Sequence, residues 1–293
     1  MVGSGAKPQA GLGGSPGGGQ DQGIEIYCRM LIVVIYCNNT EKGGGHVINE
    51  NEKIEPLGRG INLIVSRQHK LWTDTVLIAD FARPGKKDRA CDLGTGCGSI
   101  PLIWLRSGVP AQIAAVEIQE RACDMFRRSL ELNGLTDRVQ VICSDLRDLN
   151  GKLPASYYDL VVCNPPYKAD GTGIRSSDSS RLIARHESMC TMDDIAAAAS
   201  MLLNFSGRLC MCQRPERLCD VIQSMRAHDI EPKRLRFVQQ RPSKAPKLFL
   251  IEGRKGGRPG GLITEPVLFI EGNNNGFSDE MIKIYGAYKE EYL

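Results

Sequence analysis

Residues 92–98 of the 293-residue chain read DLGTGCG and join a strand-like run to an apolar helical run. Glycines in a tight turn of this kind allow positive φ angles and let a ligand approach the backbone closely. Ordinary strand-to-helix turns use the same residues, so the loop alone is a weak signal. The spacing is G-x-G-x-G, not the G-x-G-x-x-G of dinucleotide-binding folds, and the acidic residue Asp92 comes just before it. The loop is therefore a candidate site for a ligand other than a dinucleotide.

Two further acidic residues end the predicted strands that follow this loop. Glu117 ends the next strand, where a carboxylate can accept hydrogen bonds from both hydroxyls of a ribose, and Asp145 ends the third, where it can accept from the amine of an adenine. Each could instead be a solvated strand end or a helix cap. A glycine loop, a glutamate and an aspartate on successive strand ends fit an adenosine without a pyrophosphate, which indicates S-adenosylmethionine. The candidate cofactor-binding residues are Asp92, Gly94, Thr95, Gly96, Gly98, Glu117, Asp145 and Leu146.

The sequence Asn164-Pro165-Pro166-Tyr167 follows the fourth predicted strand. The two prolines stiffen the backbone and lack N–H groups, so carbonyl oxygens stay available as acceptors beside the Asn164 side chain. Such acceptors can hold both N–H groups of a flat –NH2 group, while the Tyr167 ring lies on the ring that carries it. Two accepted hydrogen bonds free the delocalised lone pair for attack on a methyl donor. Pro-Pro alone is common in strand-ending turns, but the four residues together predict a catalytic motif.

These motifs need a parallel sheet to bring them to one edge, and the pattern from about residue 55 predicts one. Short strand-like runs alternate with amphipathic helical runs, which is typical of a doubly wound α/β fold. The predicted strands are 60–67, 89–93, 112–118, 139–143, 158–163, 208–212, 234–238, 247–253 and about 266–270. The predicted helices are 73–82 (capped by Thr73 or Asp74), 100–107, 120–133, 191–203, 215–227 and one from 278 onward. We expect a Rossmann-like sheet of about seven strands.

With these motifs the chain resembles the class I S-adenosylmethionine-dependent methyltransferases that modify planar amino groups. Over about residues 54–285 it is most similar to the bacterial tRNA1(Val) adenine-N6 methyltransferase family. The similarity rests on TDTVL (73–77), DLGTGCGSIPL (92–102), NPPYK (164–168), IARHE (183–187), RPERL (214–218) and LIEGRKGG (250–257). It implies a methyltransferase domain over 54–293, S-adenosylmethionine as cofactor, catalysis by residues 164–167, and methyl transfer to N6 of adenine in tRNA.

Residues 1–45 match nothing in that family. Residues 1–23 contain nine glycines with Ser, Pro and Gln, a composition that cannot bury enough apolar area, so we expect a leader that is disordered or not native. The run 24–37 is apolar but contains Arg29 and is shorter than the roughly 20 residues of a membrane-spanning helix. Eleven cysteines, scattered through apolar runs, favour reduced thiols. We expect a cytoplasmic protein with neither a membrane nor a metal partner.

Two basic regions are candidate contacts for tRNA. The loop 168–187 carries several arginines beside the catalytic motif, and it is either a lid on RNA phosphates or a solvated loop. Residues 233–258 hold nine basic residues and one acid, Glu252. Phosphate contact would use this excess, although charges on edge strands also serve solubility.

Two other functions stay open. A protein glutamine-N5 methyltransferase would use the same acceptor motif, but such enzymes carry a helical recognition domain ahead of the core, which the glycine-rich leader cannot form. A non-catalytic RNA-binding module with a vestigial cofactor site belongs to a different class. The intact motif 164–167, together with Glu117, argues against such decay.

Overall fold

The structure is a computed structural model that describes residues 48–166, 190–272 and 276–286. All of them belong to the unit that begins at Gly45. The leader 1–45, Tyr167 and the loop 168–187, about which the sequence makes predictions, lie outside the described residues.

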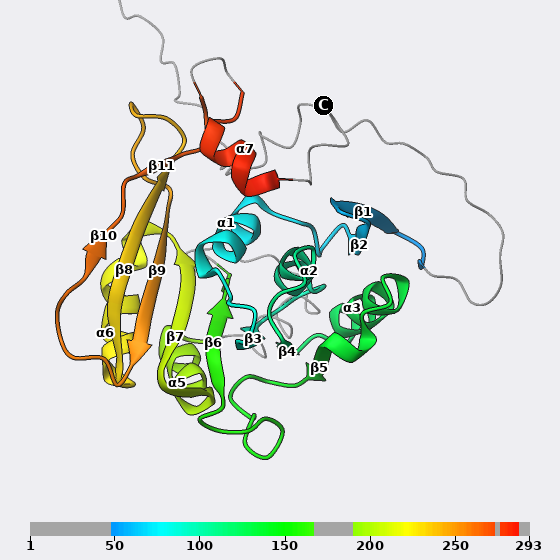
Figure 1. Ribbon diagram of the computed structural model, residues 1–293, viewed down its shortest axis with the longest axis horizontal. Coiled ribbons are helices and arrows are strands. Elements are labelled where there is room, and N and C mark those ends of the chain that lie inside the picture. The colour runs from blue at the N-terminus through cyan, green and yellow to red at the C-terminus, as the bar shows by residue number, and fades with distance from the viewer. Residues whose placement is uncertain (1–47, 167–189, 273–275, 287–293) are drawn as a thin grey trace, which may run out of the picture. The chain divides into compact units, whose positions relative to one another are not determined.

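A mostly parallel sheet runs through this unit (Figure 1). Its strands are β3 (Arg89–Leu93), β4 (Gln112–Glu117), β5 (Val139–Cys143), β6 (Tyr158–Cys163), β7 (Leu203–Gln213), β8 (Ile230–Gln239), β9 (Leu248–Lys255), β10 (Ile263–Thr264) and β11 (Leu268–Phe269). The order is β10-β8-β9-β7-β6-β3-β4-β5, β11 also pairs with β8, and only the β9 pairings are antiparallel. The expected doubly wound α/β fold is confirmed, with two short edge strands beside the seven longer ones.

Helices cover both faces of this sheet, with α1 (Thr73–Ala82), α2 (Ser99–Leu105) and α3 (Glu120–Leu132) on one face, and α5 (Met192–Leu202) and α6 (Leu218–Ala227) on the other (Figure 1). Because side chains alternate along a strand, Cys91 and Leu93 of β3 pack with Ile195 of α5, whereas Asp92 points to the opposite face. Burial on both faces explains why the strands read as continuous apolar runs.

Local sequence explains where helices form. The buried residues of α3, which include Ala122, Met125 and Phe126, recur at helical spacing. In α5 the Thr191 side chain accepts a hydrogen bond from the Asp194 backbone N–H, and Asp194 accepts one from the Thr191 N–H, which is a complete capping box. The predicted cap of α1 is wrong: Trp72 holds the N-cap position without a side-chain bond.

Several other elements differ from prediction: β10 was not predicted, and β8 begins before the predicted strand 234–238. A separate hairpin of β1 (Glu52–Gly58) and β2 (Ile61–Ser66) precedes the sheet, and its first strand was not predicted because EKIEPLG is charged and contains proline. The predicted helix 215–227 is a 3-10 turn, Pro215–Arg217, followed by α6. β7 begins before residue 208 because it continues through a bulge that interrupts its alternation.

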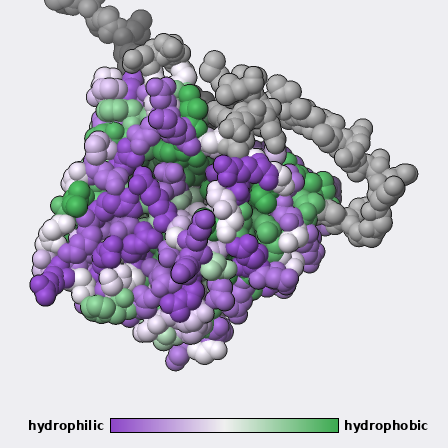
Figure 2. Space-filling model, viewed as in Figure 1, coloured by the Kyte–Doolittle hydropathy of each residue, from purple (hydrophilic) through white to green (hydrophobic). Residues whose placement is uncertain are grey.

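Hydrophilic residues cover much of the face seen in Figure 2, where hydrophobic residues gather in smaller patches. Among the described helices, none is long and apolar enough to span a membrane. The described ranges also contain no group of three or more His, Cys, Asp and Glu side chains that could hold a metal ion.

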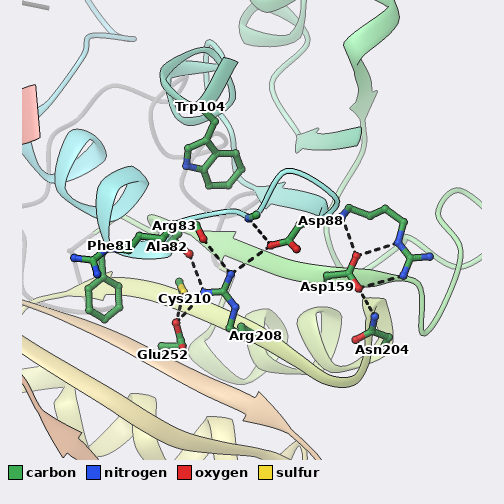
Figure 3. Close-up of polar contacts among 12 residues, drawn as sticks. Phe81, Ala82, Arg83, Asp88, Trp104, Asp159, Asn204, Arg208, Cys210 and Glu252 are labelled. Carbon is green, nitrogen blue, oxygen red and sulfur yellow. Dashed lines mark hydrogen bonds and ion pairs between the residues drawn. The ribbon is translucent and has the colours of Figure 1, made fainter. Parts of the chain in front are cut away.

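Two arginines from the sheet hold the carboxyl end of α1, and Figure 3 shows one of them, Arg208, beside Ala82 and Glu252. Arg208 of β7 donates to the Ala82 carbonyl oxygen at 2.8 Å, and Arg234 of β8 donates to that of Phe81 at 2.7 Å. Both also bind Oε2 of the buried Glu252 of β9, at 3.0 and 2.8 Å. These donors satisfy carbonyl groups that a helix end leaves without an intrahelical partner. The end of α1 is thereby tied to three strands.

Candidate active site

The glycine loop turns the chain from β3 into α2 at the carboxyl edge of the sheet. Gly98 has φ of 87°, and a Cβ there would lie 2.0 Å from the Phe126 ring of α3, so only glycine fits. At Gly96, with φ of 57°, a Cβ would meet nothing within 4 Å. The loop is therefore tightly packed against the protein on one side and open on the other, where a ligand could touch its backbone.

Glu117, at the end of β4, bonds to this loop directly. Its Oε2 accepts the Gly96 N–H at 2.9 Å, and its Oε1 accepts the Gln119 N–H at 2.9 Å. The side chain is buried, so these bonds fix its position. A carboxylate oxygen has two lone pairs, so each oxygen of Glu117 can still accept one hydrogen bond from a hydroxyl group. The arrangement suits a ligand that presents two neighbouring hydroxyl groups.

Asp92 lies beneath the loop and is completely buried. Neither of its carboxylate oxygens, nor Thr95 Oγ1, has a hydrogen-bond partner in the part of the chain that the structure describes. Burial raises the pKa of Asp92 to about 7; the nearby Thr95 hydroxyl lowers it, and the Glu117 carboxylate adds to the rise. Buried polar atoms without partners are rare in proteins, so this pair calls for a ligand. A cation would suit it, because a cation stabilises the ionised carboxylate.

Asp145 follows β5 at the same edge, but Arg147 occupies its carboxylate. The Arg147 N–H and Nε donate to Oδ1 at 2.9 and 3.0 Å, and its Nη2 forms an ion pair with Oδ2. The hydrogen bond from Arg147 holds the pKa of Asp145 below its usual value. A ligand amine at Asp145 would have to share the carboxylate with this arginine. The next residue, Leu146, is partly buried against the hydrophobic core.

Asn164 leaves β6 beside the glycine loop. Leu93 of β3 pairs with Cys163 of β6, so the residues that follow, Gly94 and Asn164, emerge at one level from neighbouring strands. Asn164 is half-buried, Pro165 is buried and Pro166 is exposed. The structure thus brings the loop, Glu117 and Asn164 to one edge, as the sequence predicts.

Comparisons with known proteins agree with this geometry. A family model described as the methyltransferase small domain matches residues 72–216. The tRNA1(Val) (adenine(37)-N6)-methyltransferase of Parabacteroides distasonis is 30% identical over 187 residues, which cover 62% of this chain and 76% of that protein. The protein of the same name from Porphyromonas gingivalis is 29% identical over 191 residues, 63% of this chain and 74% of that one. The chain belongs to this methyltransferase family.

A solved structure supports the fold of the methyltransferase. The crystal structure of a predicted O-methyltransferase from Agrobacterium tumefaciens superposes with a TM-score of 0.60 at 20% identity, covering 74% of this chain and 97% of that one. The cofactor of the methyltransferase is S-adenosylmethionine. The site fits it, because that molecule brings a sulfonium and an ammonium cation, which suit Asp92, and two ribose hydroxyls, which suit Glu117.

Two polar residues at the start of α1 also reach this edge. Asp74 and Thr75 are buried, and Asn164 Nδ2 donates to Thr75 Oγ1 at 3.3 Å. The sequence predicts a cap at this point and includes 73–77 in the family resemblance, but it does not connect these residues with Asn164. The signal that could have found them is an aspartate and a threonine at the start of a helix whose remaining residues are largely apolar.

The basic segment 233–258 of the methyltransferase is largely committed to internal contacts. Five of its nine basic residues bind glutamates or backbone carbonyls: Lys233, Arg234, Arg236, Arg241 and Lys255. An excess of charge in the sequence therefore overstates the charge that is available to a partner.

The remaining basic residues of the segment lie at opposite edges of the sheet. Lys244 and Lys247 are exposed in the turn between β8 and β9, next to the carboxyl end of β7. That is the edge of the glycine loop, because β7 runs parallel to β6 and β3. Arg254 and Arg258 are exposed near or beyond the other end of β9. Only the first pair shares an edge with Asn164.

Proposed function

We propose that this methyltransferase moves a methyl group from S-adenosylmethionine to N6 of an adenine in tRNA. The observation that carries the proposal is the register of β3 and β6, which sets Gly94 and Asn164 side by side. A methyl donor on the loop and an amine at Asn164 would then be neighbours. The relatives named as tRNA1(Val) adenine-N6 methyltransferases support adenine as the methylated base.

In this proposal, the residues at the carboxyl edge of the sheet bind the cofactor. Asp92 lies next to the cationic groups of the cofactor, Glu117 accepts from the ribose hydroxyls, and Asp145 with Leu146 receives the adenine ring. Gly94 and Gly96, with Thr95 between them, let the cofactor lie against the backbone, and Gly98 keeps the loop packed on α3. S-adenosylmethionine supplies an electrophilic methyl group when it is bound.

The reacting end holds the acceptor amine. The Asn164 side-chain oxygen and a backbone carbonyl of the 164–167 motif accept the two N–H groups of adenine N6, and Tyr167 stacks on the base. The amine lone pair then forms a bond to the methyl carbon while the carbon–sulfur bond breaks, and its electron pair stays on sulfur. The nitrogen loses one proton to water afterwards. Positioning and electrostatics supply the catalysis, and no general base is needed.

A tRNA would approach over the turn between β8 and β9. Lys244 and Lys247 are exposed there and form no ion pair with any other described residue, whereas Arg241 is paired with Glu271. Lysines of this kind suit the phosphate backbone, which needs charge and no particular sequence. The adenine itself would have to leave its stack to reach Asn164.

Transfer of labelled methyl groups tests the proposal. The full chain is incubated with methyl-tritiated S-adenosylmethionine and either unmodified tRNA or a protein extract freed of nucleic acid. We expect label in the tRNA and none above background in the protein. Label in protein alone would favour the glutamine methyltransferase, and cofactor binding without any transfer would favour a vestigial site.

A further inference from the structure

We propose that Thr75 is a positioning residue for methyl transfer, which holds the Asn164 carboxamide with its nitrogen toward α1 and its oxygen toward the substrate amine. Asp74 completes the arrangement by directing the Thr75 hydroxyl. This inference rests on the proposed function, because it assigns the orientation of the group that receives the amine. It gives a role to Asp74 and Thr75 at the start of α1.

The contacts form a chain of three side chains. Thr75 Oγ1 lies 3.5 Å from Asp74 Oδ1, to which the hydroxyl donates, and the same oxygen atom of Asp74 accepts the Thr75 backbone N–H at 2.8 Å. The Thr75 oxygen in turn accepts from Asn164 Nδ2 at 3.3 Å. Asp74 is 7% exposed and Thr75 8% exposed, so little water competes for these bonds.

The hydrogen bonds from Asn164 to Thr75 to Asp74 run in one direction, from donor to acceptor. This direction selects one of the two orientations of the Asn164 carboxamide. A carboxylate can only accept, so the Thr75 proton points to Asp74 and the Thr75 lone pairs face Asn164. If the carboxamide were turned over, two oxygens would face each other at Thr75. Its –NH2 group would then point toward the substrate, where it would meet another –NH2 group. The Thr75 hydroxyl could donate to the Asn164 oxygen only by giving up Asp74, so the Thr75 contact disfavours the orientation that cannot accept the amine.

The polarity of the chain also helps the acceptor. Hydrogen bonds in series polarise one another, and this series begins at a buried carboxylate. The donation from Nδ2 places additional electron density on the Asn164 carbonyl oxygen, which makes it a stronger acceptor. Because α1 is tied to the sheet at its other end through Phe81 and Ala82, Thr75 is held at a fixed place.

Substitutions of Thr75 test this role, with Thr73 as the matched control. Thr73 lies in the same helical turn, but its hydroxyl contacts the Tyr285 hydroxyl at 3.1 Å and not Asn164. We expect Thr75→Val to lower kcat on the order of tenfold to a hundredfold, with the S-adenosylhomocysteine affinity and the melting temperature nearly unchanged. Thr75→Ser should restore most of the rate, and Thr73→Val should keep it. Equal rates for Thr75→Val and Thr75→Ser would overturn the proposal.

A double substitution shows whether Thr75 acts through Asn164. In an Asn164→Ala background, Thr75→Val should produce no additional loss of turnover, because the group that it positions is already gone. A full additional loss would contradict the proposal. If Asn164→Ala alone left turnover intact, the proposed function of the motif would fail, and this outcome is distinct from an effect confined to Thr75.

The orientation of the Asn164 carboxamide can also be measured without substrate, by NMR. The side-chain amide resonances of Asn164 can be followed in the 15N-labelled full chain and assigned by their loss in Asn164→Asp. We expect Thr75→Val or, should that variant fold poorly, Thr75→Ala to shift one amide proton upfield and speed its exchange with water. Thr75→Ser and Thr73→Val should leave it in place. An unchanged resonance in both hydroxyl-free variants would show that Thr75 does not hold the carboxamide.

Discussion

Two buried carboxylates on the same sheet differ in their partners and in the direction of their pKa shifts. Glu252, beneath the carboxyl end of α1, binds Arg208 and Arg234; burial raises its pKa, but the two guanidinium groups outweigh this and hold it below the usual value. Asp92, beneath the glycine loop, has no hydrogen-bond partner among the described residues, and burial raises its pKa to about 7. One region is internally satisfied and stabilises the fold, whereas the other retains unsatisfied groups that a ligand can use.

Helix α1 connects the two regions. Its last carbonyl groups are bound by the arginines of the Glu252 network, and its first turn presents Thr75 to Asn164. Substitutions at the first region should therefore alter stability with little effect on the chemistry of the folded enzyme. Substitutions of residues such as Asn164, at the carboxyl edge of the sheet, should impair the chemistry with little loss of stability.

Among these predictions, the largest effect is expected for Asn164→Ala. We expect turnover on tRNA to fall on the order of a hundredfold to a thousandfold, because an acceptor of the reacting amine is lost. The melting temperature and the affinity for S-adenosylhomocysteine, measured by calorimetry, should stay close to those of the unaltered chain. Full turnover by the variant would remove Asn164 from the reaction.

The converse experiment is Glu252→Gln. The change removes the carboxylate that the partly buried Arg208 and Arg234 share, and leaves them Asp88 and Glu265 as their remaining partners. We expect a loss of about 3 kcal/mol in the free energy of unfolding at pH 7, measured with urea. S-adenosylhomocysteine affinity at low temperature should change less than twofold. The control is Asp148→Asn, which breaks an exposed ion pair with Lys152 and should alter stability very little. A Glu252 variant as stable as this control would refute the structural role of the network.

The pKa shifts of the two carboxylates predict opposite dependences of stability on pH. Glu252 ionises more readily in the folded chain, so its stabilisation is present above its ordinary pKa of 4.5 and is lost as pH falls through the lower folded value. Asp92 holds its proton up to about pH 7 when folded but only to about 3.8 when unfolded. It therefore destabilises the cofactor-free chain progressively as pH rises between these values. Asp92→Asn should raise the melting temperature of the cofactor-free protein at pH 8.

The same residue should make cofactor binding depend on pH. With a pKa of about 7, ionised Asp92 rises from about one-tenth of molecules at pH 6 to about nine-tenths at pH 8. Calorimetric affinity for S-adenosylmethionine should strengthen about tenfold over this interval. In Asp92→Asn the affinity should be weaker and nearly flat from pH 6 to pH 8. The same pH slope in both proteins would mean that another group is responsible.

The smallest expected effect concerns the exposed lysines. Lys244→Glu with Lys247→Glu should weaken tRNA binding about tenfold at low salt and reduce the salt dependence of the affinity. The matched control, Arg254→Glu with Arg258→Glu, makes the same charge change near or beyond the other end of β9 and should have a much weaker effect. Equal losses for the two double variants would show that total charge matters and its position does not.

Much of this architecture is predictable from local patterns. Strands 89–93 and 158–163 match β3 and β6, because strands buried on both faces are continuous apolar runs bounded by polar residues. Strand 139–143 matches β5, an edge strand that is only partly buried but is still rich in β-branched residues. Strand ends also predict the shared edge of Asp92, Glu117 and Asn164, because parallel strands end together. What local patterns miss is long-range pairing. The partners of the basic segment and the contact between Thr75 and Asn164 depend on residues far apart in the chain.

One measurement tests most directly whether the edge at Asn164 methylates an adenine. Unmodified tRNA is treated with S-adenosylmethionine and either the unaltered chain or Asn164→Ala, then digested to nucleosides and analysed by mass spectrometry. We expect N6-methyladenosine with the unaltered chain and its near absence with the variant. Equal amounts from both proteins, or methylation of a different base, would contradict the assignment.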